Sequence, residues 1–350
     1  MKLESQKQAR KQNYKQKLLS ILISSALSTT AFASQYSNIS ENNQISGETP
    51  IGHEVKEPEN IVTGDVNISL TPLNHSIHTY PKGLIIRSDR TENIQGTTNI
   101  AVTLASEGNT NKSPDSNAAY GISVGYDWEG NGTKETVLTL KNAATVNVDN
   151  TAGTILGTYG DAGASTKAGH QLTGVRIYRS TAEKSTPIFN AEKQLTINVE
   201  DKTAAQIGDY LTGIYVAGDG AQANLTDSNI TVNANGKFSS ALKIGKPNSN
   251  NGATINSTGK MVLDTSKTKE SATVRLFDNK SRFIAGEESA STEIKSANSA
   301  VVFDTVDFET EGTVDLNQLG IGNLVDKLNG PLADFLPYLG IPEDDICLLY

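Results

Sequence analysis

The sequence is almost free of cysteine and poor in aromatic residues. Its 350 residues include one cysteine, Cys347, so no internal disulfide can form, and aromatic residues make up 6% of the chain. A compact enzyme usually contains more core-forming residues, whereas a solenoid needs only a few inward side chains in each coil. Stability must then come from stacked elements rather than from cross-links. The composition favours an elongated repeat array.

Positive net charge is also missing. The formal net charge is −9, and removal of residues 1–33 would take away six basic residues and one acidic residue, which leaves −14. A strongly acidic surface repels the phosphates of nucleic acids and anionic lipids. We therefore expect no nucleic acid among the partners of this chain and no membrane insertion by the chain itself.

Long apolar runs are absent apart from one near the amino terminus. Residues 1–17 are basic, Leu18–Phe32 is apolar with many small residues, and Ala31-Phe32-Ala33 fits a small-x-small cleavage site. The apolar run is too short and too rich in Ser and Thr for a typical transmembrane helix. We predict a secretory signal peptide at residues 1–33 and export through the inner membrane.

What the sequence does contain is a repeated pair of strand-like segments. The clearest copy, Leu211–Asn235, alternates β-branched and polar residues on both sides of a glycine-rich turn, which is typical of half-buried strands. Related copies begin at Ser240, Ala272 and Ser299, about 27–32 residues apart, a spacing typical of solenoids. Leu172–Ile177 closely matches the start of the clearest copy. Each copy thus predicts one coil.

The repeat predicts an all-β fold, a right-handed parallel β-helix solenoid over residues 66–316. Residues 34–65 lack clear periodicity and are predicted to form a flexible leader or an amino-terminal cap. In residues 317–350, leucines recur at near-helical intervals and three prolines keep any helix short. We expect a short, partly helical C-terminal cap there, or a continuation that is cut short.

Polar insertions interrupt the strand pattern in several coils. Long loops on a rigid support are where recognition usually takes place. We therefore hypothesise that the insertions together form a binding face, although the sequence assigns no individual binding residue. The insertions are residues 105–117, 125–134, 150–170 and the shorter 246–251.

The histidines do not predict a metal site. His75 and His78 are three residues apart, so in an extended segment their side chains point to opposite faces. His53 and His170 stand alone in the sequence, and no cysteine or cluster of carboxylates accompanies any of the four. We predict neither a metal nor a cofactor.

Two loop segments match functional motifs only in part. Asp127–Thr133, which contains the only tryptophan, resembles a calcium loop, but its twelfth position is Leu138 instead of the required glutamate. Gly160–Ser165 places a serine among small residues, but it lacks the GxSxG pattern and has only His170 nearby. We interpret both segments as polar loops.

Acidic residues are the remaining catalytic candidates. Some parallel β-helix enzymes cleave polysaccharides with clustered carboxylates and basic partners on one face. The sequence shows no acidic pair or acid–base pair at matching positions of adjacent coils, so we predict no enzyme activity and no catalytic residue. A secreted or periplasmic protein that binds or cleaves polysaccharide is the alternative. The residues considered are Asp149, Glu200, Asp201, Asp264, Asp304, Asp307 and Asp315.

Several features together resemble autotransporter passenger domains of the pectin-lyase-like, AIDA-like β-helix type. They are the signal-like start, the Leu-Thr-Gly-Val/Ile openings, the Thr-Ile-x-Val closings and the Asn/Thr/Gly-rich turns. The resemblance covers residues 66–316. It implies a non-catalytic adhesin that is displayed at the cell surface or secreted, with the periplasm as the alternative. The implied partners are a host-cell surface, a glycan or like passengers on other cells.

The end of the sequence departs from this family. A complete autotransporter ends in amphipathic strands of an outer-membrane barrel, and the last residues, PEDDICLLY, do not have that pattern. We therefore expect a truncated passenger, a passenger with a separate outer-membrane translocator, or a stand-alone exported β-helix protein.

Overall fold

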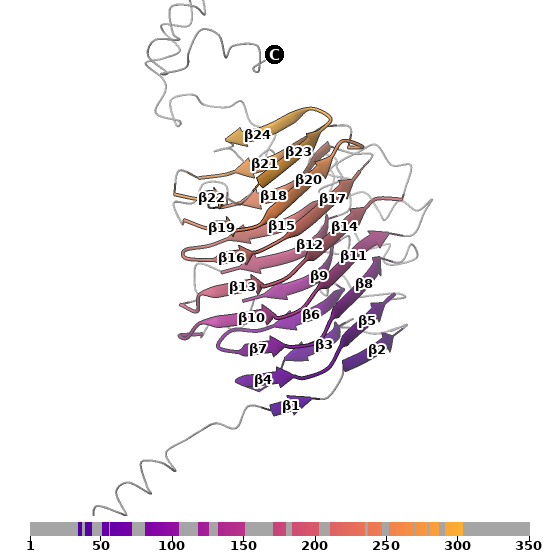
Figure 1. Ribbon diagram of the computed structural model, residues 1–350, viewed down its shortest axis with the longest axis vertical. Helices are drawn as coiled ribbons and strands as arrows, with labels where there is room; N and C mark the ends of the chain where they lie inside the picture. Colours follow the sequence, from indigo (N-terminus) through magenta and orange to yellow (C-terminus); the bar gives the residue numbers. More distant parts are fainter. Residues whose placement is uncertain are drawn as a thin grey trace, which may run out of the picture.

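The computed structural model describes residues 34–36, 39–43, 51–55, 57–71, 81–104, 118–125, 132–150, 171–179, 184–202, 211–234, 237–246, 252–268, 270–278, 280–286 and 291–303. Within these ranges the regular structure consists of β-strands alone. The strands lie across the long axis of the molecule and stack from the indigo amino-terminal end to the yellow end (Figure 1). The predicted signal peptide and the predicted C-terminal cap lie outside the described residues.

The strands form three eight-stranded sheets, numbered here 1 to 3. Sheet 1 consists of β1 (Ser34–Tyr36), β4 (Glu59–Val62), β7 (Thr91–Ile94), β10 (Thr136–Leu140), β13 (Pro187–Ala191), β16 (Gln222–Leu225), β19 (Thr254–Ser257) and β22 (Arg282–Ala285). Sheet 2 consists of β2 (Ile39–Asn43), β5 (Val66–Leu70), β8 (Thr98–Leu104), β11 (Ala144–Asn150), β14 (Leu195–Glu200), β17 (Ser228–Asn233), β20 (Lys260–Thr265) and β23 (Ser291–Ser296). Sheet 3 consists of β3 (Ile51–Val55), β6 (Lys82–Ile86), β9 (Ala118–Val124), β12 (Gln171–Tyr178), β15 (Thr212–Ala217), β18 (Lys237–Ile244), β21 (Glu270–Leu276) and β24 (Ser299–Phe303).

Each coil visits the three sheets in turn. A strand pairs in parallel with the third strand after it, as β11 pairs with β14 and β14 with β17. The chain therefore winds as a right-handed parallel β-helix, which confirms the predicted fold. The described stack ends at β24, and residues 304–316 of the predicted solenoid lie outside the described residues.

The stack begins earlier than the sequence predicted. β1 pairs with β4 and β2 pairs with β5, so strands already occur within residues 34–65. These strands are three to five residues long and are separated by segments rich in polar residues. Such short runs hold too few alternating residues to show a period, so the sequence of this segment does not reveal its strands.

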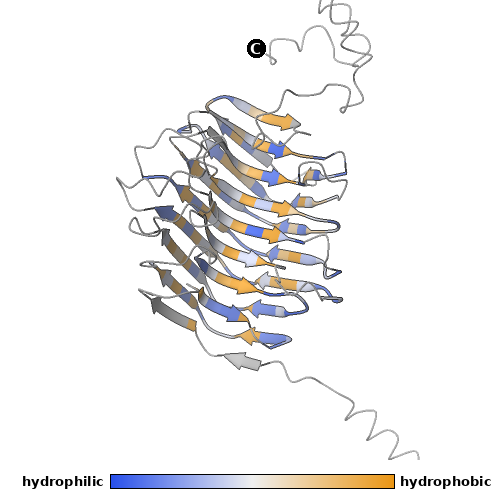
Figure 2. Cartoon of the chain, turned by 180° about the vertical axis from the view of Figure 1, so that it is seen from behind, coloured by the Kyte–Doolittle hydropathy of each residue, from blue (hydrophilic) through white to orange (hydrophobic). Residues whose placement is uncertain are grey.

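Aliphatic side chains fill the interior in continuous columns. Along sheet 2, one inward column contains Ile68, Ile100, Val146, Ile197, Ile230 and Leu263, and each of these residues is at most 3% exposed. Burial of one such side chain contributes about 1.5–3 kcal/mol. Figure 2 shows the resulting alternation of apolar and polar residues along the strands.

A column of glycines lets sheet 3 approach this aliphatic column. Gly52, Gly83, Gly121, Gly174 and Gly213 occupy the same position in successive strands of sheet 3. A Cβ atom at Gly83 would lie 2.4 Å from Cγ2 of Ile100 and 2.6 Å from the carbonyl oxygen of Gly121. The glycine of the repeated Leu-Thr-Gly opening is therefore a packing requirement.

The three corners of the coil differ in the length of their connections. From sheet 1 to sheet 2 every connection holds two to five residues. From sheet 2 to sheet 3 the first five connections hold 7 to 20 residues, the longest being 151–170. From sheet 3 to sheet 1 the longest connections are 125–135, 179–186 and 245–253.

The predicted insertions therefore do not share one corner. Residues 105–117 and 150–170 belong to the corner between sheets 2 and 3, and residues 125–134 and 246–251 belong to the corner between sheets 3 and 1. Their own placement lies largely outside the described residues. The strand bounds show that the insertions leave the stack at the two corners that flank sheet 3, and the binding face stays a prediction.

Candidate functional site

The outward side of sheet 3 carries a column of basic and aromatic side chains. Parallel register aligns one residue from each strand, and in β12, β15, β18 and β21 these residues are Arg176, Tyr215, Lys243 and Arg275. Their neighbours along each strand belong to the hydrophobic core. Because side chains alternate between the two faces of a strand, these four residues point outward. We call them the basic–aromatic column.

Tyrosines surround the first member of the column. The guanidinium of Arg176 lies 5.1 Å from the ring centroid of Tyr120 on β9 and 4.3 Å from that of Tyr178 on β12. The Tyr178 and Tyr215 rings lie 6.4 Å apart between centroids. A guanidinium over a tyrosine face is attracted by the ring quadrupole. These contacts hold Arg176 in one orientation against the sheet.

A second basic group stands beside this cluster. Lys82 is aligned with Tyr120 and is 7% exposed. Burial, together with the nearby positive charges of Arg176 and Arg87, lowers the pKa of Lys82 to about 8, and Glu54 opposes the shift. Glu54 also forms an ion pair with Arg87. The main cause of the Lys82 shift is the burial of its ammonium group, and the two arginines add to it.

The outward side of sheet 2 has a different character. Its side chains form amide ladders between coils: Asn99 donates to Asn67 at 3.0 Å and Asn198 donates to Asn147 at 2.8 Å. Sheet 1 has a similar ladder, in which Asn256 donates to Asn224 at 2.8 Å. Such ladders satisfy polar groups within the stack and stabilise the register.

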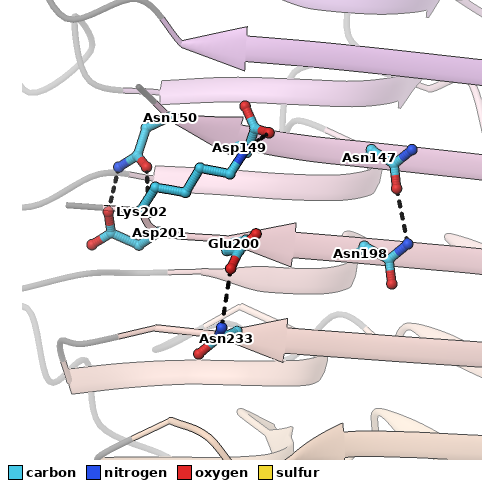
Figure 3. Close-up of polar contacts among 8 residues, drawn as sticks. All are labelled: Asn147, Asp149, Asn150, Asn198, Glu200, Asp201, Lys202 and Asn233. Atoms are coloured by element: carbon cyan, nitrogen blue, oxygen red, sulfur yellow. Dashed lines mark hydrogen bonds and ion pairs between the residues drawn. The ribbon is translucent and has the colours of Figure 1, made fainter. Parts of the chain in front are cut away.

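Carboxylates gather at the end of sheet 2 that leads toward sheet 3 (Figure 3). Asp149 and Glu200 are aligned in adjacent coils. Lys202 forms an ion pair with Asp149, and Asn233 donates to Glu200 at 3.2 Å. The hydrogen bond with Asp149 is the main reason that the pKa of Lys202 is raised.

This cluster corrects the expectation that the acidic residues are scattered. Asp149 and Glu200 occupy matching positions although 51 residues separate them. The 20-residue connection 151–170 lies between the two and hides the period. Asp201, which is 4% exposed, accepts a hydrogen bond from Asn150. Each carboxylate is thus hydrogen-bonded by an amide or an ammonium group, and only Asp149 is paired with an opposite charge.

The other acidic candidates do not join the cluster. Asp264 lies on β20 in line with Thr231, and it accepts hydrogen bonds from Ser266. These bonds outweigh its partial burial, and Lys295 and Lys267 add to the effect, so the pKa of Asp264 is lowered. Asp304, Asp307 and Asp315 lie outside the described residues.

One carboxyl group lies inside the stack. Glu92 on β7 is 1% exposed and is aligned with the buried Asn60 on β4. Burial raises the pKa of Glu92 to about 7, and the neighbouring Asn60 limits the rise. A neutral carboxylic acid fits this position far better than a carboxylate because the interior cannot hydrate a charge.

Most of the histidines and loop motifs that the sequence analysis considered fall outside the described residues. His53 lies on β3, whereas His75, His78 and His170 fall outside the described ranges. Across those ranges, no three His, Cys, Asp or Glu side chains come close enough to hold a metal ion. Gly160–Ser165 and Asp127 also lie outside them, while the Thr133 amide at the end of that loop donates to Asp89 at 2.8 Å.

The basic–aromatic column was missed by the sequence reasoning, although a signal was present. In each repeated opening the residue after the second aliphatic position is Arg176, Tyr215, Lys243 or Arg275. An alignment of the openings by their Leu-Thr-Gly or equivalent start would have placed these four residues in one line.

Comparison with known proteins found no relative: no family model, curated protein or solved structure matches the chain. In the part of the chain that the structure describes, no helix is long and apolar enough to span a membrane. The proposals below therefore depend on the fold, the register and the chemistry of the lateral faces.

Proposed function

We propose that this chain is an exported, non-catalytic β-helix scaffold that acts as an adhesin of the autotransporter passenger type. The distribution of connection lengths carries the proposal. One corner keeps two to five residues in every coil, while the corners on both sides of sheet 3 hold the insertions. A regular stack with variable connections around one face is suited to recognition, because loops on a rigid support can vary without loss of the core.

The proposed localisation of the protein is based on its first 33 residues. They combine a basic region, a short apolar region and a small-x-small site, the pattern of a secretory signal. With one cysteine in the whole chain, the stack does not require disulfide formation during export. We place the protein at the cell surface or in the medium.

Adhesion would be multivalent. Each molecule would bind its partner weakly, and many copies on one cell would raise the overall avidity through effective concentration. The partner in this proposal is a host-cell surface, a glycan or a like molecule on another cell. An outer-membrane translocator would be needed wherever the chain is displayed rather than released.

The test uses the full chain expressed in a Gram-negative host. Surface display is measured by protease digestion of intact cells, and adherence is measured by counting cells bound to cultured epithelium. In one variant, residues 151–170 are replaced by a three-residue turn, as in the short connection 234–236. A control variant keeps their length and composition but scrambles their order.

We expect both variants to be displayed and to lose adherence, because the control preserves length but not the recognition sequence. Unchanged adherence in the variant with the short turn would remove residues 151–170 from the binding surface. Absence of the protein from the surface and from the medium would contradict the proposal as a whole.

A polysaccharide-active protein is the second candidate, and the cluster of Asp149, Glu200 and Lys202 favours it. Aligned carboxylates beside an ammonium group are the kind of groups that act on glycosidic bonds. Loss of viscosity of an acidic polysaccharide, abolished by Asp149→Asn, would support this candidate against the adhesin.

A further inference from the structure

We propose that the carboxyl-terminal end of the stack is closed by residues 304–316 of the same chain, which add a further rung to sheets 1 and 2 and keep a second molecule from pairing there. The proposal follows from the apolar side chains at the last described coil, from the spacing of inward residues in earlier coils and from the point where the chain leaves β24. It does not depend on the adhesin function.

The last described coil, at the yellow end of the stack, leaves inward side chains uncovered (Figure 1). Val301 on β24 continues the inward column of Val274, and it is 46% exposed whereas Val274 is 0% exposed. Phe283 on β22 and Ile294 on β23 are only partly buried, although the residues aligned with them one coil earlier are fully buried. Exposure of core positions on all three sheets indicates that another layer of side chains belongs on this end.

The backbone is open at the same end. Each of β22, β23 and β24 pairs with the strand of the coil before it, and no described strand pairs with its other edge. An open edge presents a row of N–H and C=O groups that can pair with a further strand. The missing layer must therefore supply strands as well as apolar side chains.

The chain itself continues from this end. β24 ends at Phe303, and residues 304–350 follow it in the sequence. One coil takes 27 residues here, as from Ala272 to the aligned Ser299, so the continuation is long enough for a further rung. Because it is tethered to β24, its effective concentration at the end exceeds that of a second molecule. We therefore assign the end to the continuation of the chain.

A nearly constant spacing links the inward columns of sheets 1 and 2. In five of the seven coils that show both columns, the sheet 2 residue follows its sheet 1 counterpart by eight positions, because the corner between these sheets is short. Beyond Phe303, the apolar residues Phe308 and Leu316 have the same separation. The five pairs are Asn60–Ile68, Glu92–Ile100, Leu138–Val146, Phe189–Ile197 and Ile255–Leu263.

This spacing assigns the register of the added rung. Phe308 lies over Phe283 in sheet 1, and Leu316 lies over Ile294 in sheet 2. Each of the two side chains then covers a side chain that the last described coil leaves partly exposed. A phenyl ring against a phenyl ring and leucine against isoleucine extend the two columns with residues of similar size.

The corner between sheets 3 and 1 allows the same register. From Val301 to Phe308 the chain advances seven positions. His53 and Asn60, which occupy the corresponding columns near the amino-terminal end, are also seven positions apart. The chain can therefore pass from β24 to the added strand of sheet 1 by a connection as short as one already present in the fold.

The charged residues of the segment also fit. The register places Asp307 opposite Arg282, an opposite-charge pair of the kind that stabilises neighbouring strands. It places Asp315 opposite Glu293, where like charges repel. Lys295 forms an ion pair with Glu293 at 3.4 Å on the same face, and its charge offsets that repulsion.

A second molecule is the competing occupant. The strands β1, β2 and β3 at the opposite end also have one edge without a described partner, so two molecules can stack head to tail. Such a contact does not close on itself and produces filaments. A rung formed by residues 304–316 blocks this growth.

Disulfide trapping in the full chain tests the register, with Cys347→Ser to remove the only native cysteine. One test variant carries Ile284→Cys with Glu309→Cys, outward neighbours on sheet 1 in the proposed register. Aligned Cα atoms of neighbouring strands lie about 4.8 Å apart, within the range that a disulfide bridges. The matched control, Ile284→Cys with Thr310→Cys, moves one cysteine to the opposite face of the strand.

A second pair tests sheet 2 in the same way. The variant Glu293→Cys with Asp315→Cys joins outward neighbours, and Glu293→Cys with Val314→Cys is its control. We expect the test variants to form a disulfide within one molecule at least about fivefold more completely than their controls under mild oxidation. Electrophoresis without reductant and mass spectrometry of the digested protein measure the yield.

The other results of trapping would overturn the proposal. A disulfide between two molecules would show that a second copy covers the end. Equal yields in test and control variants, or no disulfide in either test variant, would show that residues 304–316 do not lie on the last coil in this register.

A measurement without cysteines checks the closure itself. Phe308→Asp with Leu316→Asp places charges on the inward side of the rung, and Thr313→Asp with Asn317→Asp adds the same charges on its outward side. We expect the inward variant to lower the Tm by about 5 °C or more and to associate as concentration rises in sedimentation experiments, whereas the outward variant lowers the Tm by less than about 2 °C. Equal Tm values for the two variants, with no association of the inward one, would contradict the closure.

Discussion

Sheets 2 and 3 stack eight strands each in the same parallel register, yet they use their outward columns in different ways. On sheet 2, asparagines of adjacent coils hydrogen-bond each other, as Asn198 does when it donates to Asn147. On sheet 3, register brings Lys243 opposite Arg275, and the Nε atom of Arg275 donates to the Ser240 hydroxyl.

The comparison shows two ways in which a solenoid engages its outward side chains. Amide ladders add stability wherever identical residues stack, so the polar face of sheet 2 is explained by the fold alone. On sheet 3, Arg176 stacks on Tyr120 and Tyr178, and Arg275 donates to Ser240, so the contacts join residues of different types.

The largest effect is expected where the two sheets touch. Gly121→Val would place a Cβ atom 2.3 Å from Cγ1 of Val146 and 2.6 Å from the carbonyl oxygen of Gly174. Because backbone cannot move aside within a packed stack, we expect a loss of about 4 kcal/mol in the free energy of unfolding. Urea denaturation measures this loss in the free energy of unfolding.

The control for this change is Ala241→Gly, at the same position of a later strand. It removes one methyl group without a clash and should cost about 1 kcal/mol. If Gly121→Val costs no more than this control, the close approach of sheets 2 and 3 does not depend on the glycine column.

Much of this architecture was readable from the sequence, for a physical reason. The repeat between Leu211 and Ser299 has nearly constant spacing, because the connections there are short and each coil needs the same number of residues. Alternation and spacing together then predict parallel stacking. Upstream, the 20-residue connection 151–170 breaks the period, so the alignment of Asp149 with Glu200 could not be recognised.

The lateral faces were harder to predict. Binary patterning identifies inward residues, but it treats Arg176 and Asn198 alike as polar positions. Only register brings Arg176 beside Tyr215, and only the turn of the coil separates that face from the amide ladders. The buried Glu92 was missed for a related reason, since a charged residue at an inward position violates the pattern that defines the core.

Glu92 extends the comparison from the outward faces of the sheets to a titratable group in the interior of the stack. The folded pKa is raised from 4.5 to about 7, so the stabilising effect of the neutral form is fully present below pH 4.5 and is lost as the pH rises through about 7. Relative to Glu92→Gln, the native chain should lose on the order of 3 kcal/mol across this window. Urea denaturation at pH 4.5 and at pH 8 checks the difference.

The matched control for that series is Glu293→Gln, an exposed carboxylate on sheet 2. Its removal should change stability by less than about 0.5 kcal/mol at either pH, because an exposed ion pair contributes little. A native chain that follows the pH dependence of Glu92→Gln would show that Glu92 is ionised or hydrated within the fold.

The smallest effect concerns the ladder that defines the sheet 2 face. In a double-mutant cycle, Asn147→Ala and Asn198→Ala should show a coupling of about 0.5–1 kcal/mol, because each single change removes the same 2.8 Å hydrogen bond. Asn67→Ala combined with Asn198→Ala is the control, and these side chains are not paired, so the two effects should add. A coupling of zero between Asn147 and Asn198 would mean that the ladder gives no stability. The amide ladders of sheet 2 would then differ from the contacts on sheet 3 in residue type but not in their contribution to stability.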